Sequence, residues 1–314
     1  MSVADETRAF LLAIDALTDP IMRVVLGDLA RALPSLAADA SAAAMRLAAL
    51  APGALAAFVA RESRVLAAAF GGVVGNAAAM VLPLLMQAQG AAVGAGLDAA
   101  HRLVMLAAPL GVAWQPVAVA DVRAQLAAVQ GKTLPALVRA LVRDTVTRTR
   151  TALAAALRSD QPALSAARVL ETASEQAATR LETIAATETM RAGRTAMTAA
   201  YAANRDAVPR FVRRSRRDGR VCILCVSLDG KAQDSDAVMA SHPRCRCVAT
   251  PQLLAAGVDG EAWFSEQPEN IQRAVLGPGA LAKYRDGAPL AAFMKIEETK
   301  WGPVVTRRRL SEVR

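Results

Sequence analysis

One long uncharged segment constrains the fold of this chain more than any other feature. No residue between Arg64 and Asp98 carries a charge, and a second uncharged run extends from Leu103 to Ala120. A segment of this length is long enough to cross a membrane. It is also rich in glycine and alanine and contains Pro83 and several amide side chains, which favours a packed helical hairpin or an oligomer interface. Membrane insertion is the alternative interpretation.

The composition of the chain favours helices over sheets. Alanine supplies much of the 54% hydrophobic share, and aromatic residues make up 4% of the chain. Alanine is the best helix former, whereas strands are enriched in aromatic and β-branched residues. We therefore expect a mainly α protein, with a helical N-terminal half followed by a small α+β C-terminal module that contains a cluster of cysteine and histidine side chains.

Prolines interrupt the first part of the sequence. From Ala4 to about Val59, apolar residues recur at helical spacing, with Pro20, Pro34 and Pro52 breaking the pattern. Helices usually end before a proline, so the pattern predicts a few short antiparallel helices.

A long amphipathic helix is expected from about Pro162 to Tyr201. Asp160 is a suitable N-cap residue, and proline is favoured at the first helical position. The apolar face of this helix consists of Leu170, Ala173, Ala177, Leu181 and Ile184.

These patterns divide the chain into five contiguous segments. They are short helices over residues 1–64, the apolar helical segment 65–120, amphipathic helices over 121–205, a Cys/His module over 206–256 and a C-terminal tail over 257–314. A secretory signal begins with basic residues followed by an apolar run, whereas this chain has the acidic residues Asp5 and Glu6 near its start. We therefore expect synthesis in the cytoplasm.

Arginines are concentrated just before the Cys/His module. The chain has a formal net charge of +9, and arginine binds phosphate and carboxylate groups in a bidentate manner. DNA, an acidic protein surface and lipid headgroups are all compatible with such a stretch, and a solvated charge run is the alternative. The candidates for contact with an anionic partner, called here the arginine segment, are Arg210, Arg213, Arg214, Arg216, Arg217 and Arg220.

Five soft-ligand residues gather in one short part of the chain. The four cysteines of the sequence form a C-x-x-C pair and a C-x-C pair, and one of the two histidines precedes the second pair. The C-x-x-C spacing lets two thiolates converge on one ion from a tight turn. These residues, called here the Cys/His cluster, are Cys222, Cys225, His242, Cys245 and Cys247.

Structural zinc is the ion that the Cys/His cluster favours. Tetrahedral zinc takes four ligands, so one of the five candidates is spare. We expect Cys222, Cys225 and Cys245 as ligands, together with either His242 or Cys247. Reduced packing cysteines and a disulfide are the alternatives. A catalytic metal is not expected, because no H-E-x-x-H or related pattern supplies a general base.

A probable turn separates the two halves of the cluster. Leu228–Lys231 contains the dipeptide Asp-Gly, which is typical of tight turns. Short strands on either side of it would bring the two ligand pairs together.

The order of residues around the cluster resembles a known family. Asp218–Lys231 reads D-x-R-V-C-x-x-C-x-x-L-D-G-K, and His242–Cys247 reads H-P-x-C-R-C. This combination resembles the phage Mu F-like family of minor head, or head-morphogenesis, proteins. The flanking regions that agree with the family are Ala186–Ala192, Trp263–Pro268, Gln272–Gly279 and Tyr284–Arg285.

The resemblance covers about residues 180–310. It implies a structural minor head protein of a tailed phage or prophage, internal or portal-associated, that acts in head assembly or genome delivery. The implied partners are the portal or other head proteins, further copies of the chain and the packaged DNA, and the implied location is the virion head after synthesis in the host cytoplasm. Independently of the resemblance, the apolar segment 65–120 would allow contact with a membrane during genome ejection.

No catalytic or cofactor-binding residue is expected. The chain contains no nucleotide-binding loop of the G-x-x-x-x-G-K-[ST] type and no G-x-S-x-G motif, and no acidic pair lies beside the cluster. The alternatives to a head protein are a zinc-stapled DNA-binding protein without sequence specificity and a membrane-inserting ejection protein.

Overall fold

The computed structural model describes residues 3–107, 113–130, 134–254, 259–299 and 302–313. The protein is mainly helical. A helical N-terminal half is followed by a smaller part of short helices and strands that holds the Cys/His cluster. This arrangement confirms the fold class expected from the sequence.

The chain forms two compact units, and each is assembled from separate stretches of sequence. The first, called here the mixed unit, consists of Met1–Leu17, Gln89–Gly131 and Ala186–Arg314. The second, the helical unit, consists of Thr18–Ala88 and Lys132–Ala185. Both units therefore differ from the five contiguous segments expected from the sequence, and the expected boundary at 256/257 lies outside the described residues.

Helix α1, Val3–Ala48, corrects the prediction of several short helices. It continues through Pro20 and Pro34 and ends shortly before the 3-10 turn at Pro52–Ala54. A proline inside a helix costs about 3 kcal/mol. Burial of each large apolar side chain contributes roughly 1.5–3 kcal/mol, so a few buried residues around each proline offset that cost. The buried residues nearest the two prolines are Ile21, Val25, Leu29 and Leu36.

Helix α2, Leu55–Ala107, is one continuous helix with Pro83 inside it. The helical hairpin expected within 65–120 is therefore wrong for the described part of that segment. By length and composition the stretch Leu55–Leu106 is able to cross a membrane, and 39% of its most apolar window is buried. The apolar run thus forms a helix, as its glycine and alanine content indicated, but with no turn before Ala107.

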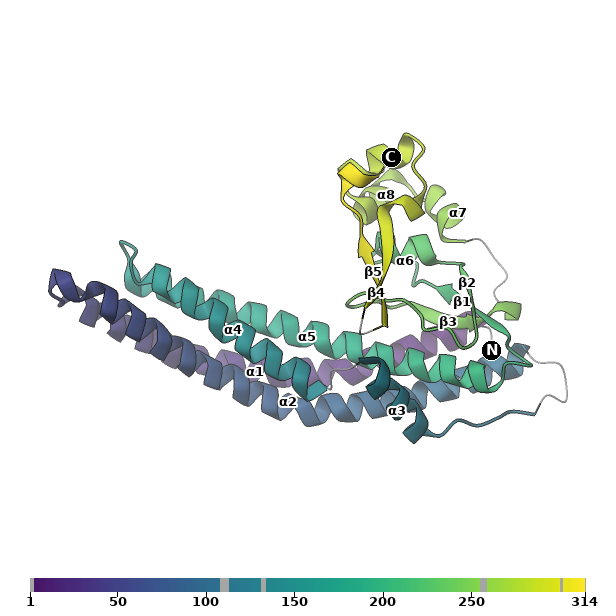
Figure 1. Ribbon diagram of the computed structural model, residues 1–314, viewed down its shortest axis with the longest axis horizontal. Helices are drawn as coiled ribbons and strands as arrows, with labels where there is room; N and C mark the ends of the chain where they lie inside the picture. Colours follow the sequence, from purple (N-terminus) through teal and green to yellow (C-terminus); the bar gives the residue numbers. More distant parts are fainter. Residues whose placement is uncertain (1–2, 108–112, 131–133, 255–258, 300–301, 314) are drawn as a thin grey trace. The chain divides into compact units, whose positions relative to one another are not determined.

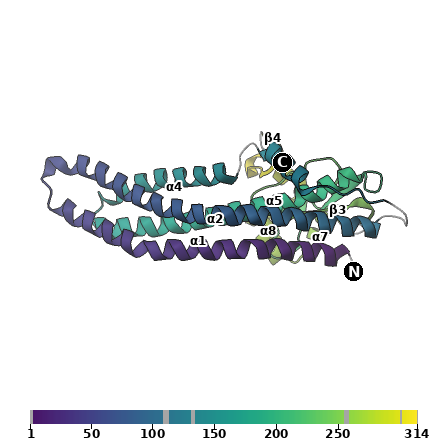
Figure 2. The same ribbon diagram turned by 90° about the horizontal axis from the view of Figure 1, so that it is seen from below.

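The helical unit is built from parts of α1 and α2 together with α4, Leu134–Ala156, and part of α5, Pro162–Ala203. These helix segments lie side by side in Figures 1 and 2. Arg46 on α1 pairs with Glu62 on α2 at 2.8 Å, and Arg180 on α5 pairs with Asp144 on α4 at 3.0 Å.

The start and end of α5 confirm the predicted long helix. Its apolar face is buried as expected, apart from Ile184, which is half-buried. The fully buried positions of that face are Leu170, Ala173, Ala177 and Leu181.

The mixed unit contains a three-stranded antiparallel sheet. Its central strand β1, Arg210–Arg214, pairs with β2, Ala232–Asp234, on one side and with β3, Val248–Pro251, on the other. A second, two-stranded sheet is formed by β4, Met294–Thr299, and β5, Gly302–Arg307. The remaining helices of this unit are α3 Val119–Gln130, α6 Ile223–Leu228, α7 Gly260–Ser265, α8 Glu269–Leu276 and α9 Pro278–Arg285.

Aromatic side chains anchor the C-terminal part of the mixed unit. Phe264 is completely buried, and Tyr284 meets it edge-on with ring centroids 5.2 Å apart. Trp263 is half-buried at the edge of this core, and the Arg217 guanidinium lies 5.9 Å from its ring centroid. Gly277, with φ of 76°, separates α8 from α9, as the Leu-Gly-Pro-Gly sequence predicts.

Close helix packing in α2 depends on particular glycines. A Cβ atom at Gly71 would lie 2.4 Å from a side chain of α4, and one at Gly96 would lie 2.2 Å from the carbonyl oxygen of Gly193 on α5. A Cβ at Gly75 or Gly94 would meet no atom of the described chain within 4 Å. The small size of Gly71 and Gly96 is therefore required inside the protein, whereas that of Gly75 and Gly94 is not.

Candidate metal centre

The first pair of ligands lies at the start of a short helix. Cys222 precedes α6, and its carbonyl oxygen accepts hydrogen bonds from the backbone N–H groups of Cys225 at 3.0 Å and Val226 at 3.1 Å. This turn brings the two thiols of the C-x-x-C pair to the same end of α6. Sequence reasoning expected a strand before the turn at Leu228–Lys231, and the structure corrects this, because α6 precedes the turn and only β2 follows it.

The turn itself needs its glycine. Gly230 has φ of 84°, in the left-handed region that favours glycine, and its N–H donates to the carbonyl of Arg213 in β1 at 2.9 Å. A Cβ atom at this position would lie 2.7 Å from the side chain of Asp259. The Asp-Gly pair therefore holds the end of α6 against the central strand.

The second group of ligands is fixed by contacts on both sides. Ser241, just before His242, exchanges backbone hydrogen bonds with the start of β5. The N–H of Arg244 donates to the Thr187 hydroxyl of α5 at 2.9 Å. Cys247 directly precedes β3, which pairs with β1. The strand pairing of β1 with both β2 and β3 thus brings the two halves of the motif together.

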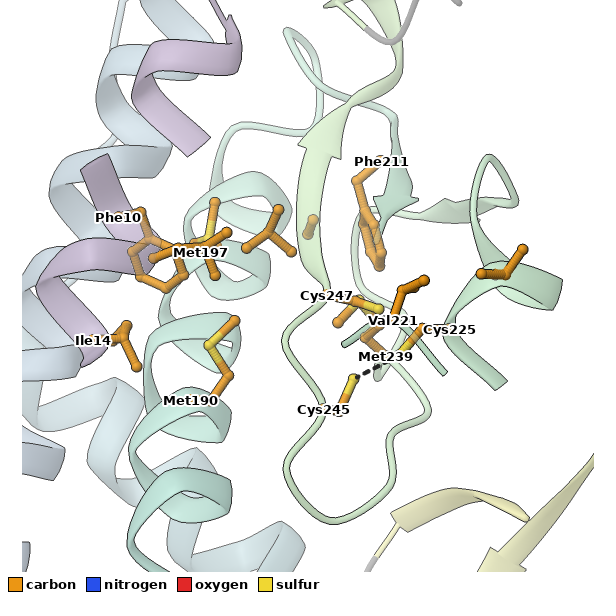
Figure 3. Close-up of a cluster of buried hydrophobic side chains, with 14 of the residues drawn as sticks. Phe10, Ile14, Met190, Met197, Phe211, Val221, Cys225, Met239, Cys245 and Cys247 are labelled. Atoms are coloured by element: carbon orange, nitrogen blue, oxygen red, sulfur yellow. Dashed lines mark hydrogen bonds between the residues drawn. The ribbon is translucent and has the colours of Figure 1, made fainter. Parts of the chain in front are cut away.

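The side chains of the Cys/His cluster converge. The Nε2 atom of His242 lies 3.3 Å from the Sγ atom of Cys222 and 3.1 Å from that of Cys225, and the Sγ atoms of Cys225 and Cys245 are 4.0 Å apart. The ligand atoms of Cys225, Cys245 and Cys247 all lie within 4.8 Å of one another. Figure 3 shows these three cysteines facing one another beside Val221 and Met239.

These separations suit a tetrahedral ion. With zinc–sulfur and zinc–nitrogen bonds of about 2.3 and 2.0 Å, ligand atoms around one zinc lie about 3.5–3.8 Å apart. The separations from His242 Nε2 to the Sγ atoms of Cys222 and Cys225, and between the Sγ atoms of Cys225 and Cys245, run from 3.1 to 4.0 Å. The cluster as a whole is able to bind a metal ion.

The electrostatics of the cluster favour the charged form of some members and the neutral form of others, because contacts with Cys222, Cys245 and Cys247 raise the pKa of Cys225 above its usual range. The hydrogen bond from Cys225, together with His242, lowers the pKa of the Cys222 thiol to about 4. Contacts with Cys225 and Cys247 likewise hold the pKa of Cys245 well below its usual range. Burial works against the charged form of His242, but its contacts with Cys222 and Cys245 raise its pKa to about 10. A metal ion would take the place of the protons that these groups share.

The buried arginine Arg213 belongs to this centre and not to a surface. Its side chain is 1% exposed, its Nη1 group donates to the carbonyl of Ala240, and its Nη2 group donates to the Sγ atom of Cys245 at 3.2 Å. Burial opposes the charge of Arg213, but its electrostatic interactions with Cys247, Cys245 and Cys225 raise its pKa. The expected contact of Arg213 with an anionic partner is therefore corrected, because strand β1 turns this side chain inward.

A second buried arginine was missed by sequence reasoning. Arg194 on α5 donates to the carbonyl oxygens of Cys245 at 3.0 Å and Cys247 at 3.5 Å. It follows the same three- and four-residue spacing as the buried residues Met190, Met197 and Tyr201. That spacing was the available signal, since an arginine within an apolar helix stripe needs buried polar partners.

The other members of the arginine segment are partly neutralised by acids. Arg210 pairs with Asp234 at 3.3 Å, Arg216 with Asp15 at 3.2 Å and Asp218 at 3.1 Å, and Arg217 with Asp229 at 2.7 Å. Arg210 and Arg220 are exposed, whereas Arg214, Arg216 and Arg217 are half-buried. The segment therefore offers a weaker positive surface than its sequence indicates.

Two carboxylates of the motif tie its loops together. Asp229 is 1% exposed and accepts hydrogen bonds from the N–H of Ser215 at 3.1 Å, its hydroxyl at 2.9 Å and Arg217. Asp218 forms a bidentate pair with Arg246, with both distances 2.7 Å. Arg246 lies between the last two cysteines, so this pair links the two halves of the cluster sequence.

A cavity of about 380 Å³ lies in the mixed unit, and sequence reasoning gave no signal for it. Its walls come from α3, α5, the segment after β2 and the start of β5, and Arg194 is one of its lining residues. The same arginine thus reaches both this cavity and the backbone of the Cys/His cluster.

No family model, curated protein or solved structure matches this chain. The candidate metal centre is therefore assigned from its own geometry and from the residue order of the motif.

Proposed function

We propose that the protein is a structural minor head protein of a tailed phage or prophage, internal or portal-associated, in which a zinc ion holds the C-terminal part of the mixed unit. The observation that carries this proposal is the convergence of the two halves of the motif, D-x-R-V-C-x-x-C and H-P-x-C-R-C, at one buried cluster. The motif resembles that of Mu F-like head-morphogenesis proteins. In this proposal the protein is synthesised in the host cytoplasm and then resides in the virion head.

The choice of zinc rests on ligand chemistry. Thiolates and imidazole in tetrahedral arrangement favour zinc over magnesium, calcium or manganese, which prefer oxygen ligands. Within the cluster, Cys225, Cys245 and Cys247 are buried, and Cys222 and His242 are half-buried. A buried site of this kind supports a structural role, in which metal binding contributes directly to folding.

A non-catalytic role is supported by the state of the nearby carboxylates. Asp229 and Asp218, the acids of the motif, are both engaged by arginine at 2.7 Å. Hydrogen bonds from Arg246 and from the N–H of Arg220 lower the pKa of Asp218, which makes this carboxylate a weaker general base. The proposed partners are accordingly the portal or other head proteins and further copies of this chain, with packaged DNA as a further contact.

A membrane-inserting ejection protein is the second candidate. The observation that favours it is the stretch Leu55–Leu106 of α2, which is long and apolar enough to cross a bilayer. The third candidate, a DNA-binding protein without sequence specificity, has less support, because Arg213 is buried and several other members of the arginine segment face acids.

The experiment is to produce phage particles carrying an epitope-tagged chain, purify full heads by density centrifugation and quantify each protein by mass spectrometry. We expect the chain in the heads at a copy number comparable to that of the portal, and co-purification with the portal from lysates in which heads are not assembled. A chain that is absent from heads and remains with host DNA or host membranes would overturn the proposal. Recovery with membranes during infection would support the ejection alternative.

A further inference from the structure

We infer that the metal ion is held by Cys222, Cys225, His242 and Cys245, with Cys247 left as an unligated thiol and Arg213 as the buried counter-charge of the centre. This inference rests on the zinc ion of the proposed function. It names which of the five candidates is spare and gives the buried arginine a role that its sequence context did not suggest.

The orientation of His242 selects it as a ligand. Its Nδ1 atom lies 2.8 Å from the carbonyl oxygen of Pro243, so Nδ1 is the protonated nitrogen that donates there. The Nε2 atom is then the nitrogen that faces the cluster, 3.3 Å from the Sγ atom of Cys222 and 3.1 Å from that of Cys225, where a metal ion would displace its proton. A backbone carbonyl that fixes the tautomer of the opposite nitrogen is the usual support of a metal-binding histidine.

The ligand atoms form two groups, each within 4.8 Å, that share Cys225: one contains Cys222 and His242, and the other contains Cys245 and Cys247. His242 is in hydrogen-bond contact with Cys222, Cys225 and Cys245. The contacts of Cys247 run instead to Cys225, Cys245 and Arg213. A four-ligand site that includes both members of the C-x-x-C pair is therefore completed more directly by His242 than by Cys247.

Arg213 supplies the charge that such a centre lacks. Zinc with three thiolates and one neutral imidazole carries a net charge of −1, and an uncompensated charge in a protein core is costly. The Arg213 guanidinium is 1% exposed and donates to the Sγ atom of Cys245 at 3.2 Å. Hydrogen bonds to a ligating sulfur disperse its negative charge, so Arg213 acts on the ion through Cys245 as a positioning residue.

The second buried arginine has a different task. Arg194 donates to the carbonyl oxygens of Cys245 and Cys247 and so orients the backbone of the C-x-C pair. Arg213, by contrast, donates directly to the Sγ atom of Cys245. The two arginines therefore have different expected roles. Arg213 acts on the metal ion through a ligand sulfur, and Arg194 orients the backbone that carries the ligands.

The ligand set is tested first on the unaltered full-length protein. X-ray absorption spectroscopy at the zinc edge counts sulfur and nitrogen neighbours without any substitution. We expect three sulfur atoms and one nitrogen atom. A first shell of four sulfur atoms would overturn the assignment, and a wild-type protein without metal would overturn both this inference and the zinc part of the proposed function.

Substitutions then test the two residues separately, with cobalt(II) as a spectroscopic probe. Cys247→Ser should bind one cobalt per chain with an unchanged visible spectrum and unchanged thiolate-to-metal charge-transfer intensity, whereas Cys222→Ser should lose about a third of that intensity or the ion itself. A Cys247→Ser protein that loses intensity as Cys222→Ser does would show that Cys247 is a ligand.

Arg213→Met should lower the affinity for zinc about 10–100-fold, the range found when a group that supports a metal ligand is removed. Arg213→Lys should restore most of the affinity, because it keeps the charge. Arg220→Met, an exposed change in the same segment, is the matched control and should leave the affinity unchanged. If Arg213→Met and Arg220→Met bind zinc with the same affinity, Arg213 is not the counter-charge of the metal centre. None of these results depends on whether the protein is found in phage heads, so failure of the metal assignment and failure of the head-protein proposal are distinguishable.

Discussion

The mixed unit and the helical unit are stabilised in different ways. The helical unit consists of segments of long helices, and its aromatic residues are Phe58 and Phe70. The mixed unit holds all four cysteines, both histidines and the remaining aromatic residues of the sequence. It also contains every strand of the described chain, none longer than six residues.

This difference follows from element length. Long helices bury an apolar stripe over many turns, so their stability is spread over many small contributions. Short strands and one- or two-turn helices are marginal by themselves and need specific cross-links. In the mixed unit such links are the Cys/His cluster, the buried Arg213 and the pairs of Asp218 and Asp229 with arginine. Loss of the metal ion that links these elements should therefore be more damaging than a single substitution in the helical unit.

Metal removal should have the largest effect and should separate the two units. Treatment with a strong chelator under reducing conditions should increase hydrogen exchange in residues 210–251, while residues 55–88 keep their protection. The expected loss is at least about 5 kcal/mol, since structural zinc sites contribute roughly 10–16 kcal/mol in small zinc domains. Hydrogen exchange read by mass spectrometry measures this. Re-addition of zinc should restore protection, and an equal loss in both units would contradict the comparison.

A large core truncation in the helical unit should come next. Phe70 on α2 is 0% exposed, and Phe70→Ala should cost about 3–5 kcal/mol through lost burial and a cavity. Denaturant unfolding measures the loss, and zinc content should stay at the wild-type value. The control is Val65→Ala on the same helix, where the side chain is 56% exposed and the expected change lies within about 0.5 kcal/mol. Loss of zinc in Phe70→Ala would show that the two units are not stabilised independently.

The glycines at the close approach of α2 and α5 allow a matched pair of substitutions. Gly96→Ala should destabilise the protein by about 1–3 kcal/mol, because the new Cβ atom would lie 2.2 Å from the backbone oxygen of Gly193. Gly94→Ala, two residues away, meets no described atom within 4 Å and should be neutral or stabilise by up to about 1 kcal/mol. Thermal unfolding of the two variants side by side tests this. Equal stability would mean that the helices separate easily at Gly96.

The pair between Asp218 and Arg246 should contribute less and should depend on pH. Burial works against the charged form of Asp218, but hydrogen bonds from Arg246 and from the N–H of Arg220 outweigh it and lower its pKa. A lowered folded-state pKa means that the stabilisation is fully present above the unfolded pKa of about 3.9 and is lost as pH falls through the folded value.

Asp218→Asn should accordingly cost about 1–2 kcal/mol at neutral pH and progressively less in acid. The difference in unfolding free energy between wild type and variant, measured from pH 7 downwards, is the readout. Asp206→Asn, at an exposed position, serves as the control. A pH-independent difference would indicate that Asp218 acts through packing and not through its charge.

The smallest effect on the folded chain is expected at Gly75. Its Cβ position is open, so Gly75→Leu should change the stability of a single chain by less than about 1 kcal/mol. If copies of the protein associate through this face of α2, the larger side chain should dissociate the oligomer, which analytical ultracentrifugation would detect. A bilayer-spanning helix would instead tolerate the more apolar residue and still partition into liposomes. If the oligomer persists in Gly75→Leu, the interface between copies does not include the face of α2 that contains Gly75.

Several features of this protein were determined by the sequence alone, because they depend on neighbouring residues. The start of α5 at Pro162, the break between α8 and α9 at Gly277 and the turn at Gly230 all follow from local backbone preferences. The spacing of the cysteines in two short pairs likewise predicted that the Cys/His cluster would form. Such pairs bind one metal ion only when the fold brings both pairs to the same place.

Other features were decided by the tertiary structure. The continuation of α1 through Pro20 and Pro34, and of α2 through Pro83, depends on what packs against these helices, because local preference alone favours a break. The same holds for Arg213, which has the sequence context of a surface arginine but lies inside, where the sulfur atoms of the cluster make burial of its charge favourable. A local pattern states which conformations a segment prefers, whereas the free energy of burial depends on partners that are far away in the sequence.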